Sequence, residues 1–132
     1  MSESLIVDGF KSSQVFQQIA DGLASQSSSE RKATVGKVKG IFQMEIKPSS
    51  GPAQSWTLNF KDGEGEVYKG KVKSGKADAT ILVSDDDFMK MASGELNGQK
   101  AFMSQKIRIK GQMMLATKLD AVLKSAKVQS KL

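Results

Sequence analysis

The spacing of apolar residues changes twice along this chain, and the change restricts the fold to one that combines helices with strands. Over residues 10–23 and again over 115–126, apolar side chains recur at intervals of three and four, as on one face of a helix. Between residues 41 and 110, several short segments instead alternate apolar with polar side chains, as in strands buried on one face. With 132 residues, the chain is predicted to be one α+β domain.

Five segments have the pattern of strands. Residues 41–47 and 56–60 alternate on either side of a proline-containing loop, which predicts a hairpin. Residues 67–68 indicate a short third strand, and residues 79–84 form a β-branched, nearly continuous apolar run typical of a strand inside a sheet. Residues 106–110 alternate basic with apolar side chains and are expected to form the last strand.

Capping residues indicate where the first two helices begin and end. Asp8 or Ser12 is expected to cap the first helix, because short polar side chains can accept hydrogen bonds from the free backbone N–H groups there. Ser27 and Glu30 have the spacing of a capping box, which predicts a second helix. Gly40 is expected to end that helix.

Ser84 precedes three aspartates, and this sequence has two interpretations. Ser84 and Asp87 fit the first and last positions of a capping segment, and acids in a first turn complement the helix dipole. Asp85, Asp86 and Asp87 could instead hold a hard cation, but three consecutive positions fan outward around a helix and no calcium-loop pattern follows. We therefore predict a helix here, then a short helix capped by Asn97, for about five helices in total.

The composition argues against most enzyme classes. The chain has no cysteine and no histidine, which removes disulfides, thiolate nucleophiles, imidazole bases and most zinc sites. Its longest uninterrupted apolar run is residues 113–116, far shorter than the roughly 20 residues of a membrane-spanning helix. We expect a protein without enzymatic activity, metal or cofactor.

Positive charge is concentrated near the end of the chain. The net charge is +6, and residues 98–131 carry eight lysines and arginines against the single acid Asp120. Such a segment attracts an anionic membrane surface or nucleic acid. Tyr68 and Trp56 are the only aromatic residues besides phenylalanine, and Trp56 is expected on a buried face, so few rings could stack on bases. We favour transient contact with an anionic membrane, with a basic nucleic-acid-binding module as the alternative function.

Methionine is frequent between residues 89 and 114, where five of the seven methionines lie. One explanation is ordinary core filling, because methionine adapts to irregular gaps. The other is an adaptable apolar lining that repacks around ligands of different shape. Phe88, Phe102, Leu115 and Leu119 would contribute to such a wall.

A series of motifs in a fixed order resembles the sterol carrier protein type 2 family, also called the non-specific lipid-transfer proteins. The motifs are DGFK at 8–11, WTL at 56–58, ADATI at 77–81, SDDDF at 84–88, SGELN at 93–97, KAF at 100–102, KIRIKG at 106–111 and ML at 114–115. They extend over nearly the whole chain. Two positions depart from the family pattern, because Gln105 stands where many relatives have glycine and Gly98 stands where proline follows asparagine.

The resemblance implies a single lipid-binding domain over residues 1–132. Its implied fold is a five-stranded mixed, largely antiparallel sheet, covered on one face by about five helices and enclosing an apolar tunnel. The tunnel would bind a fatty acid, fatty acyl-CoA, sterol or phospholipid. The family is non-catalytic by itself, and it transfers or presents lipids in peroxisomes.

We expect apolar residues of the strands and of the last third of the chain to line this tunnel. They are Trp56, Val83, Phe88, Met91, Ala92, Phe102, Met103, Ile107, Ile109, Met113, Met114, Leu115, Leu119 and Leu123. The cations expected to contact the lipid headgroup, coenzyme A or the membrane are Lys100, Lys106, Arg108 and Lys110. The final residues Ser130, Lys131 and Leu132 have the form of a peroxisomal targeting signal, which an import receptor would bind.

Overall fold

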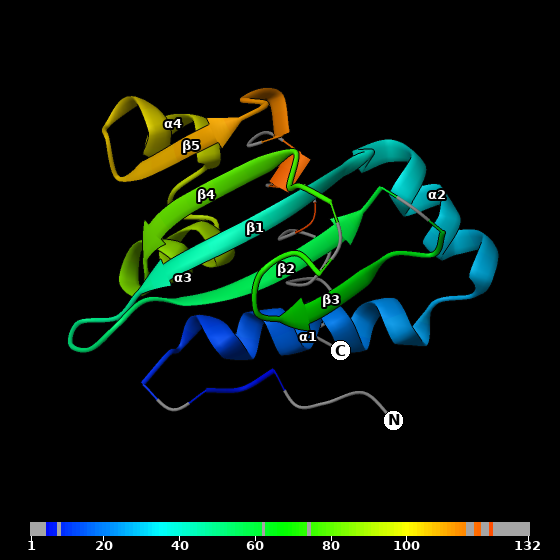
Figure 1. The fold of residues 1–132 in the computed structure, drawn as a ribbon, viewed down its shortest axis with the longest axis horizontal. Helices are drawn as coiled ribbons and strands as arrows, with labels where there is room; N and C mark the ends of the chain where they lie inside the picture. The colour runs from blue at the N-terminus through cyan, green and yellow to red at the C-terminus, as the bar shows by residue number, and fades with distance from the viewer. Residues whose placement is uncertain are drawn as a thin grey trace.

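The computed structural model describes residues 5–7, 9–61, 63–73, 75–115, 118–119 and 122. Figure 1 shows the order of its elements, which are α1 (Ser12–Ser25), α2 (Ser28–Val38), β1 (Gly40–Lys47), β2 (Gln54–Phe60), β3 (Glu66–Lys69), β4 (Ala79–Ser84), α3 (Asp85–Ser93), α4 (Gly98–Met103) and β5 (Ile107–Gly111). None of the helices in these ranges combines the length and apolar character that a membrane-spanning segment needs.

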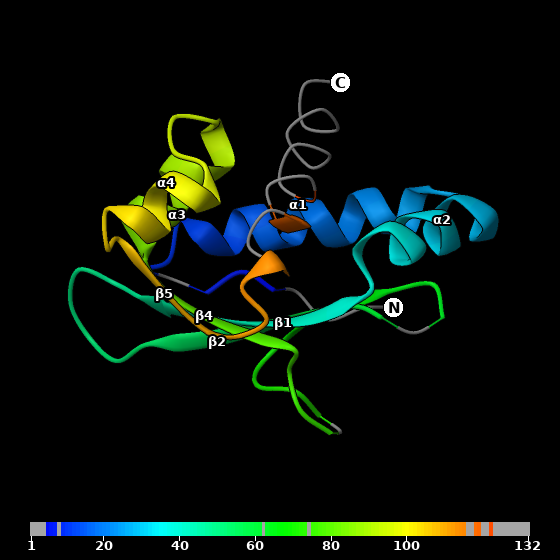
Figure 2. The ribbon, with the colours of Figure 1, turned by 90° about the horizontal axis from the view of Figure 1, so that it is seen from above.

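The strands form one sheet in the order β3-β2-β1-β4-β5. The central strand β1 pairs antiparallel with β2 and parallel with β4, while β2 with β3 and β4 with β5 pair antiparallel. The predicted five-stranded mixed, largely antiparallel sheet is therefore confirmed. Figure 2 shows all four labelled helices on the same face of this sheet.

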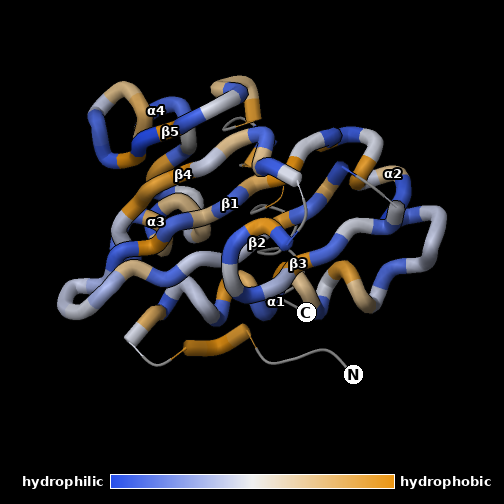
Figure 3. Tube along the Cα trace, in the orientation of Figure 1, coloured by the Kyte–Doolittle hydropathy of each residue, from blue (hydrophilic) through white to orange (hydrophobic). Residues whose placement is uncertain are grey.

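The helix-covered face of the sheet carries the core. Phe42, Met44 and Ile46 alternate along β1 and are fully buried, as their period predicts. The change between apolar and polar residues along the strands is visible in Figure 3. On the helical side, α1 contributes Phe16 and Ile19 to the same buried cluster. The apolar faces that the two spacings predicted, one on β1 and one on α1, thus pack in the same core.

Stacked aromatic rings fix α1 and α3 against the sheet. Phe16 stacks on Trp56 and on Phe88, with ring centroids 4.9 Å apart in both pairs. The indole Nε1–H of Trp56 is buried and donates a hydrogen bond to the carbonyl oxygen of Leu5 at 3.0 Å. This bond satisfies the polar atom of Trp56 and holds the segment before α1 on the core.

The capping box of α2 is confirmed, but the residue expected to end this helix is not the one that does. The Ser27 hydroxyl accepts from the Glu30 backbone N–H, and the Glu30 carboxylate accepts from the Ser27 backbone N–H, which lowers the pKa of Glu30. Lys39 takes the left-handed conformation at the C-cap, with φ 53°, and Gly40 begins β1. Glycine at position 40 leaves room for the side chain of Leu115, because a Cβ there would lie 2.7 Å from it and Leu115 would have to shift.

The N-terminus of α1 is capped from a distant part of the chain. Ser12 lies inside the helix with a buried hydroxyl that has no hydrogen-bond partner in the described ranges, and Asp8 lies outside those ranges. The Asp85 carboxylate instead accepts from the backbone N–H groups of Lys11 and Ser12, at 3.0 and 2.8 Å. The expected local cap is therefore wrong for Ser12, because a residue 73 positions away supplies the acceptor.

The other two helices begin as predicted. The Ser84 hydroxyl accepts from the Asp87 backbone N–H at 3.1 Å, and the Asn97 side chain accepts from the Lys100 backbone N–H at 2.7 Å. Four helices are described instead of about five. Of the terminal helix expected over 115–126, only residues 115, 118, 119 and 122 fall in the described ranges, and Leu115, Leu119 and Val122 are buried there.

Candidate functional site

A groove of about 580 Å³ lies between α4 and the edge strand β5. Its lining consists of Phe102, Met103, Gln105, Ile107, Arg108 and Ile109. The volume falls within the range of about 300–1,000 Å³ that is usual for small-molecule pockets. The lining is mainly apolar, with one cation among six residues.

A tight turn brings α4 and β5 together. The Gln105 backbone N–H donates to the Phe102 carbonyl oxygen at 3.1 Å, and the Lys106 N–H donates to the Ala101 carbonyl oxygen at 2.8 Å. Gln105 adopts φ 62°, the left-handed conformation that residues with a side chain rarely take. The turn therefore folds β5 back along α4 at a cost in backbone strain.

The floor of the groove is part of the core face of the sheet. Ile107 and Ile109 lie opposite Val83 and Ile81 of β4, both of which are buried. Ile107 itself is only 2% exposed, whereas Ile109 is half-buried. Because side chains alternate along a strand, Arg108 leaves β5 on the opposite side from these two isoleucines. An apolar floor thus meets a positive charge at the edge of the sheet.

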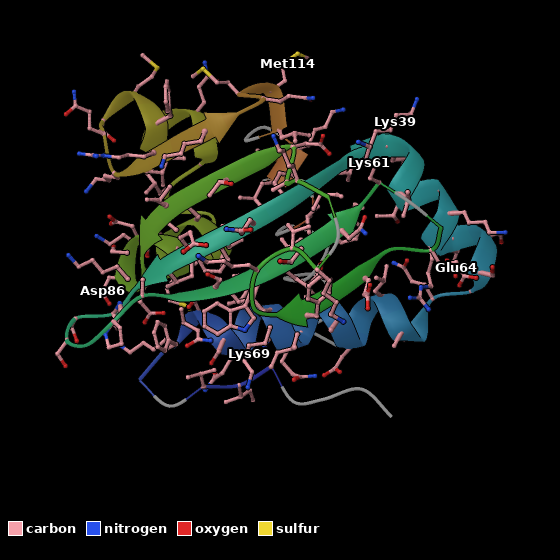
Figure 4. All side chains as sticks on the ribbon, in the orientation of Figure 1. Lys39, Lys61, Glu64, Lys69, Asp86 and Met114 are labelled. Carbon is pink, nitrogen blue, oxygen red and sulfur yellow. The ribbon has the colours of Figure 1, made fainter. Side chains whose placement is uncertain are left out.

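Four large apolar side chains stand exposed along this edge of the molecule. Phe102 is 38%, Met103 75%, Met113 50% and Met114 75% exposed. We call these four residues the apolar rim. Two come from α4 and two from the segment after β5, and Figure 4 shows Met114 projecting outward there. A concentration of exposed apolar side chains is typical of a binding surface.

The residues predicted to line a tunnel divide into three groups. Phe102, Met103, Ile107 and Ile109 line the groove. The residues packed in or against the core are Trp56, Val83, Phe88, Met91, Ala92, Leu115 and Leu119. Met113 and Met114 are exposed at the rim, and Leu123 lies outside the described residues.

The four predicted cations are all exposed. Lys106 approaches Asp87 at 4.0 Å, but Lys100, Arg108 and Lys110 form no ion pair with a described residue. Three positive charges beside the groove are therefore available to an anion. Ser130, Lys131 and Leu132 lie outside the described residues.

Gln105 lines the groove but was absent from the predicted lining, because the sequence drew attention to it only as a departure from the glycine of many relatives. Its amide-bearing side chain gave no signal of an apolar lining, and nothing in glutamine itself indicates a positive φ. Two signals were available: the glycine that many relatives have at this position, which favours a positive φ, and the place of residue 105 between the end of a predicted helix and the start of a predicted strand. Any tight connection there brings its side chain to the space between them.

A second hollow of about 480 Å³ lies beside the segment before α1. It is lined by Ile6, Val7, Gly9, Phe10, Lys11, Gln14, Ser49, Asp85 and Asp86. About half of these residues are polar or charged, so an acyl chain placed here would leave polar groups without water. The hollow is a poorer site for an apolar ligand than the α4–β5 groove.

Two other chemistries receive little support from the described residues. No group of three or more acidic side chains is arranged there to hold a metal ion. The carboxylate of Asp85 already accepts hydrogen bonds from two backbone N–H groups at the N-terminus of α1. Trp56 is fully buried, so its ring is not available to stack on a nucleic-acid base. The groove between α4 and β5 offers mainly apolar side chains and one cation.

Comparison with known proteins gives consistent matches. Residues 16–124 match the SCP-2 sterol transfer family. The chain is 39% identical over 125 residues to a fatty acid-binding protein of Yarrowia lipolytica, covering 93% of this chain and 96% of that protein. It is 36% identical to the oleate-induced peroxisomal protein POX18 of Candida maltosa, covering 98% and 99% of the two chains. The solved apo structure of sterol carrier protein 2 from Yarrowia lipolytica superposes with a TM-score of 0.86 at 37% identity, covering 94% of this chain and 98% of that one.

Proposed function

Because the chain belongs to the SCP-2 sterol transfer family, we propose that it carries a fatty acid, fatty acyl-CoA, sterol or phospholipid in the groove between α4 and β5. The observation that carries this proposal is the apolar floor of the groove, formed by Ile107 and Ile109, with the cation Arg108 at its edge. An apolar wall beside a positive charge suits a lipid with an acidic headgroup. The name of the fatty acid-binding relative, which aligns over nearly its full length, agrees with such a ligand.

The energetics of an acyl chain suit a carrier. Removing each methylene from water is favourable by about 0.8 kcal/mol, whether the chain moves into a protein groove or into a bilayer. The exchange between the two is therefore nearly balanced. A groove with an apolar lining and few polar contacts would then take up and release lipids of different shapes.

We propose that the groove extends inward as a tunnel when a lipid is bound. Ile107 belongs both to the floor of the groove and to the buried core, and Met91 is also packed in that core. An empty cavity costs roughly 24 cal/mol per Å³, so a tunnel left vacant would destabilise the protein. Unbranched methionine side chains such as Met91 can repack at low cost as a lipid enters. The tunnel is closed without lipid and is opened by it.

The proposed membrane contact uses the edge of the molecule that bears the groove. The apolar rim can enter the interface of a bilayer, while Lys100, Arg108 and Lys110 meet anionic headgroups. Each cation near such a surface contributes about 1 kcal/mol. Binding of this strength is reversible, as a carrier that shuttles between membranes requires.

We propose that the protein acts in the peroxisome and catalyses no reaction itself. The relative from Candida maltosa is named as a peroxisomal protein, and an import receptor would bind Ser130, Lys131 and Leu132. The side chains include no cysteine or histidine that could serve as nucleophile or base. Adding one residue after Leu132 should prevent peroxisomal import and leave lipid binding unchanged; import that survives the addition would contradict the targeting role.

Displacement of a fluorescent fatty acid tests the lipid site directly. Met103→Glu places a carboxylate in the groove lining, and Met114→Glu is the matched control because both methionines are 75% exposed but only Met103 lines the groove. We expect Met103→Glu to weaken fatty-acid binding about tenfold, equivalent to about 1.4 kcal/mol, and Met114→Glu to change it little. Equal affinities for the two variants would place the lipid elsewhere.

A further inference from the structure

The methionines of this chain differ sharply in their access to solvent. Met44 is fully buried and Met91 is 4% exposed, whereas Met103 and Met114 are 75% and Met113 50% exposed. The chain has no cysteine, and its single tryptophan is fully buried. Met89 is half-buried and packs against the core, so Met103, Met113 and Met114 are the most exposed of the readily oxidised side chains in the described ranges.

Only one of the three exposed methionines lines the groove. Met103 is the last residue of α4, and its side chain forms part of the lining with Ile107 and Ile109. Met113 and Met114 follow β5 and are absent from that lining. Oxidation of Met103 therefore changes the chemistry of the groove wall, while oxidation of the other two changes only the outer surface.

We propose, on the basis of the function proposed above, that Met103 is an oxidation site through which hydrogen peroxide lowers the affinity of the groove for lipid. A lone pair of the thioether sulfur attacks one oxygen of the peroxide, the O–O bond breaks, and an S–O bond forms. The sulfur loses two electrons, the attacked oxygen gives up its proton, and the second peroxide oxygen takes up a proton and leaves as water. The products are methionine sulfoxide and one molecule of water, so no further reactant is needed.

The sulfoxide is polar and accepts strong hydrogen bonds, unlike the thioether that it replaces. In contact with an acyl chain it would lose its bonds to water without gaining others, so the lipid-bound state becomes less favourable. We expect affinity for a fatty acid to fall about fivefold when Met103 is oxidised. Methionine sulfoxide reductases reverse the modification, which makes the change a switch and not only damage.

The experiment uses the full chain and two matched variants, Met103→Leu and Met114→Leu. Leucine keeps an apolar side chain of similar volume at each position and cannot be oxidised. All three proteins are treated with hydrogen peroxide, mapped by peptide mass spectrometry and titrated with a fluorescent fatty acid before and after treatment. Circular dichroism spectra before and after treatment check that the oxidised proteins keep their fold.

We expect an added oxygen atom at Met103, Met113 and Met114 and none at Met44 or Met91 at the same dose. Treated wild type and Met114→Leu should both bind fatty acid about fivefold more weakly, whereas Met103→Leu should change by less than about twofold. Sulfoxide reductase should restore the wild-type affinity.

Three results would overturn the inference. They are equal loss of affinity in Met103→Leu and wild type, unchanged affinity of wild type that is oxidised at Met103, and oxidation of Met44 as fast as that of Met103. If the untreated protein binds no fatty acid, the proposed function itself is wrong, and the oxidation map then reports only which methionines are exposed to solvent. The two failures are thus distinguishable.

Discussion

Asp85 joins two helices that are far apart in the sequence, and replacing it should destabilise the whole domain. Its carboxylate accepts hydrogen bonds from the backbone N–H groups of Lys11 and Ser12, at 3.0 and 2.8 Å, and the residue is 7% exposed. It also stands in the first turn of α3, directly after the capping residue Ser84. One side chain therefore links the starts of α1 and α3.

The cost of Asp85→Asn follows from these contacts. Asparagine keeps one carbonyl oxygen as an acceptor but turns an NH₂ group toward the second backbone N–H. Losing one hydrogen bond to a charged group costs about 1.5–3 kcal/mol, and a buried N–H without an acceptor adds to this. We expect a loss of about 2–4 kcal/mol of unfolding free energy, a large part of the 5–15 kcal/mol typical of a domain.

Asp86→Asn is the matched control. Asp86 is the next residue along α3 and is exposed. Its replacement by asparagine removes the same charge from the same helix turn as Asp85→Asn does. The loss of favourable interaction with the helix dipole is then similar in both variants, about 0.3–1 kcal/mol. Urea denaturation followed by circular dichroism measures both, with the slope m expected to stay unchanged. Equal destabilisation by the two substitutions would refute the cap that joins α1 to α3.

Three further predictions concern single positions. Gln105→Gly should raise stability by about 0.5–1 kcal/mol in thermal or urea denaturation, because it relieves the φ of 62°; lower stability would contradict the strain. Gly40→Ala should cost about 1–3 kcal/mol, because its Cβ would lie 2.7 Å from Leu115, and the cost should disappear in a Leu115→Ala background. The N–H donated by Ser27 holds the pKa of Glu30 below its usual value, so its contribution to stability is present at neutral pH and lost as the pH falls through that lowered pKa. Glu30→Gln should therefore make the acid limb of a pH–stability profile less steep, and an unchanged limb would contradict this.

The alternation of apolar residues located β1, β2 and β5, whereas β4 was located from a nearly continuous apolar run and β3 from two residues typical of strands. Phe42, Met44 and Ile46 show the alternation most clearly, because a single buried face forces the period of two. The pairing between strands follows from another source, since the parallel contact of β1 with β4 is a property of the chain path and not of either strand alone. The family resemblance implied a mixed sheet, which the alternation by itself could not.

Capping was predictable where it is local and unpredictable where it is not. Ser27 and Glu30 lie within one helical turn, so their spacing contains all the information that their hydrogen bonds require. Asp85 looked like part of the first turn of its own helix, and nothing in its neighbours indicated that its carboxylate serves α1. Lys39 ends α2 where Gly40 was expected, and Gly40 instead lies against Leu115, a contact between distant residues that local capping patterns do not contain.

The sequence identified the apolar residues of the groove as candidates, but it did not show how they come together. Phe102 was expected on a short helix, Met103 belonged to the methionine-rich stretch, and Ile107 and Ile109 lay on one face of a predicted strand, so all four were candidates for the lining. Which candidates stay at the surface and which join the core depends on how α4 is placed over β5. That placement depends on the turn at Gln105, whose backbone conformation its side chain does not reveal.

A lipid site between α4 and β5 is tested by amide chemical shifts during a titration with a fatty acid, because the shifts report both whether a lipid binds and which residues it affects. We predict saturable shifts concentrated in α4 and β5, over residues 98–111, with little change around Ile6 and Gln14 beside the second hollow. No saturable shift, or shifts confined to the second hollow, would contradict a lipid site between α4 and β5.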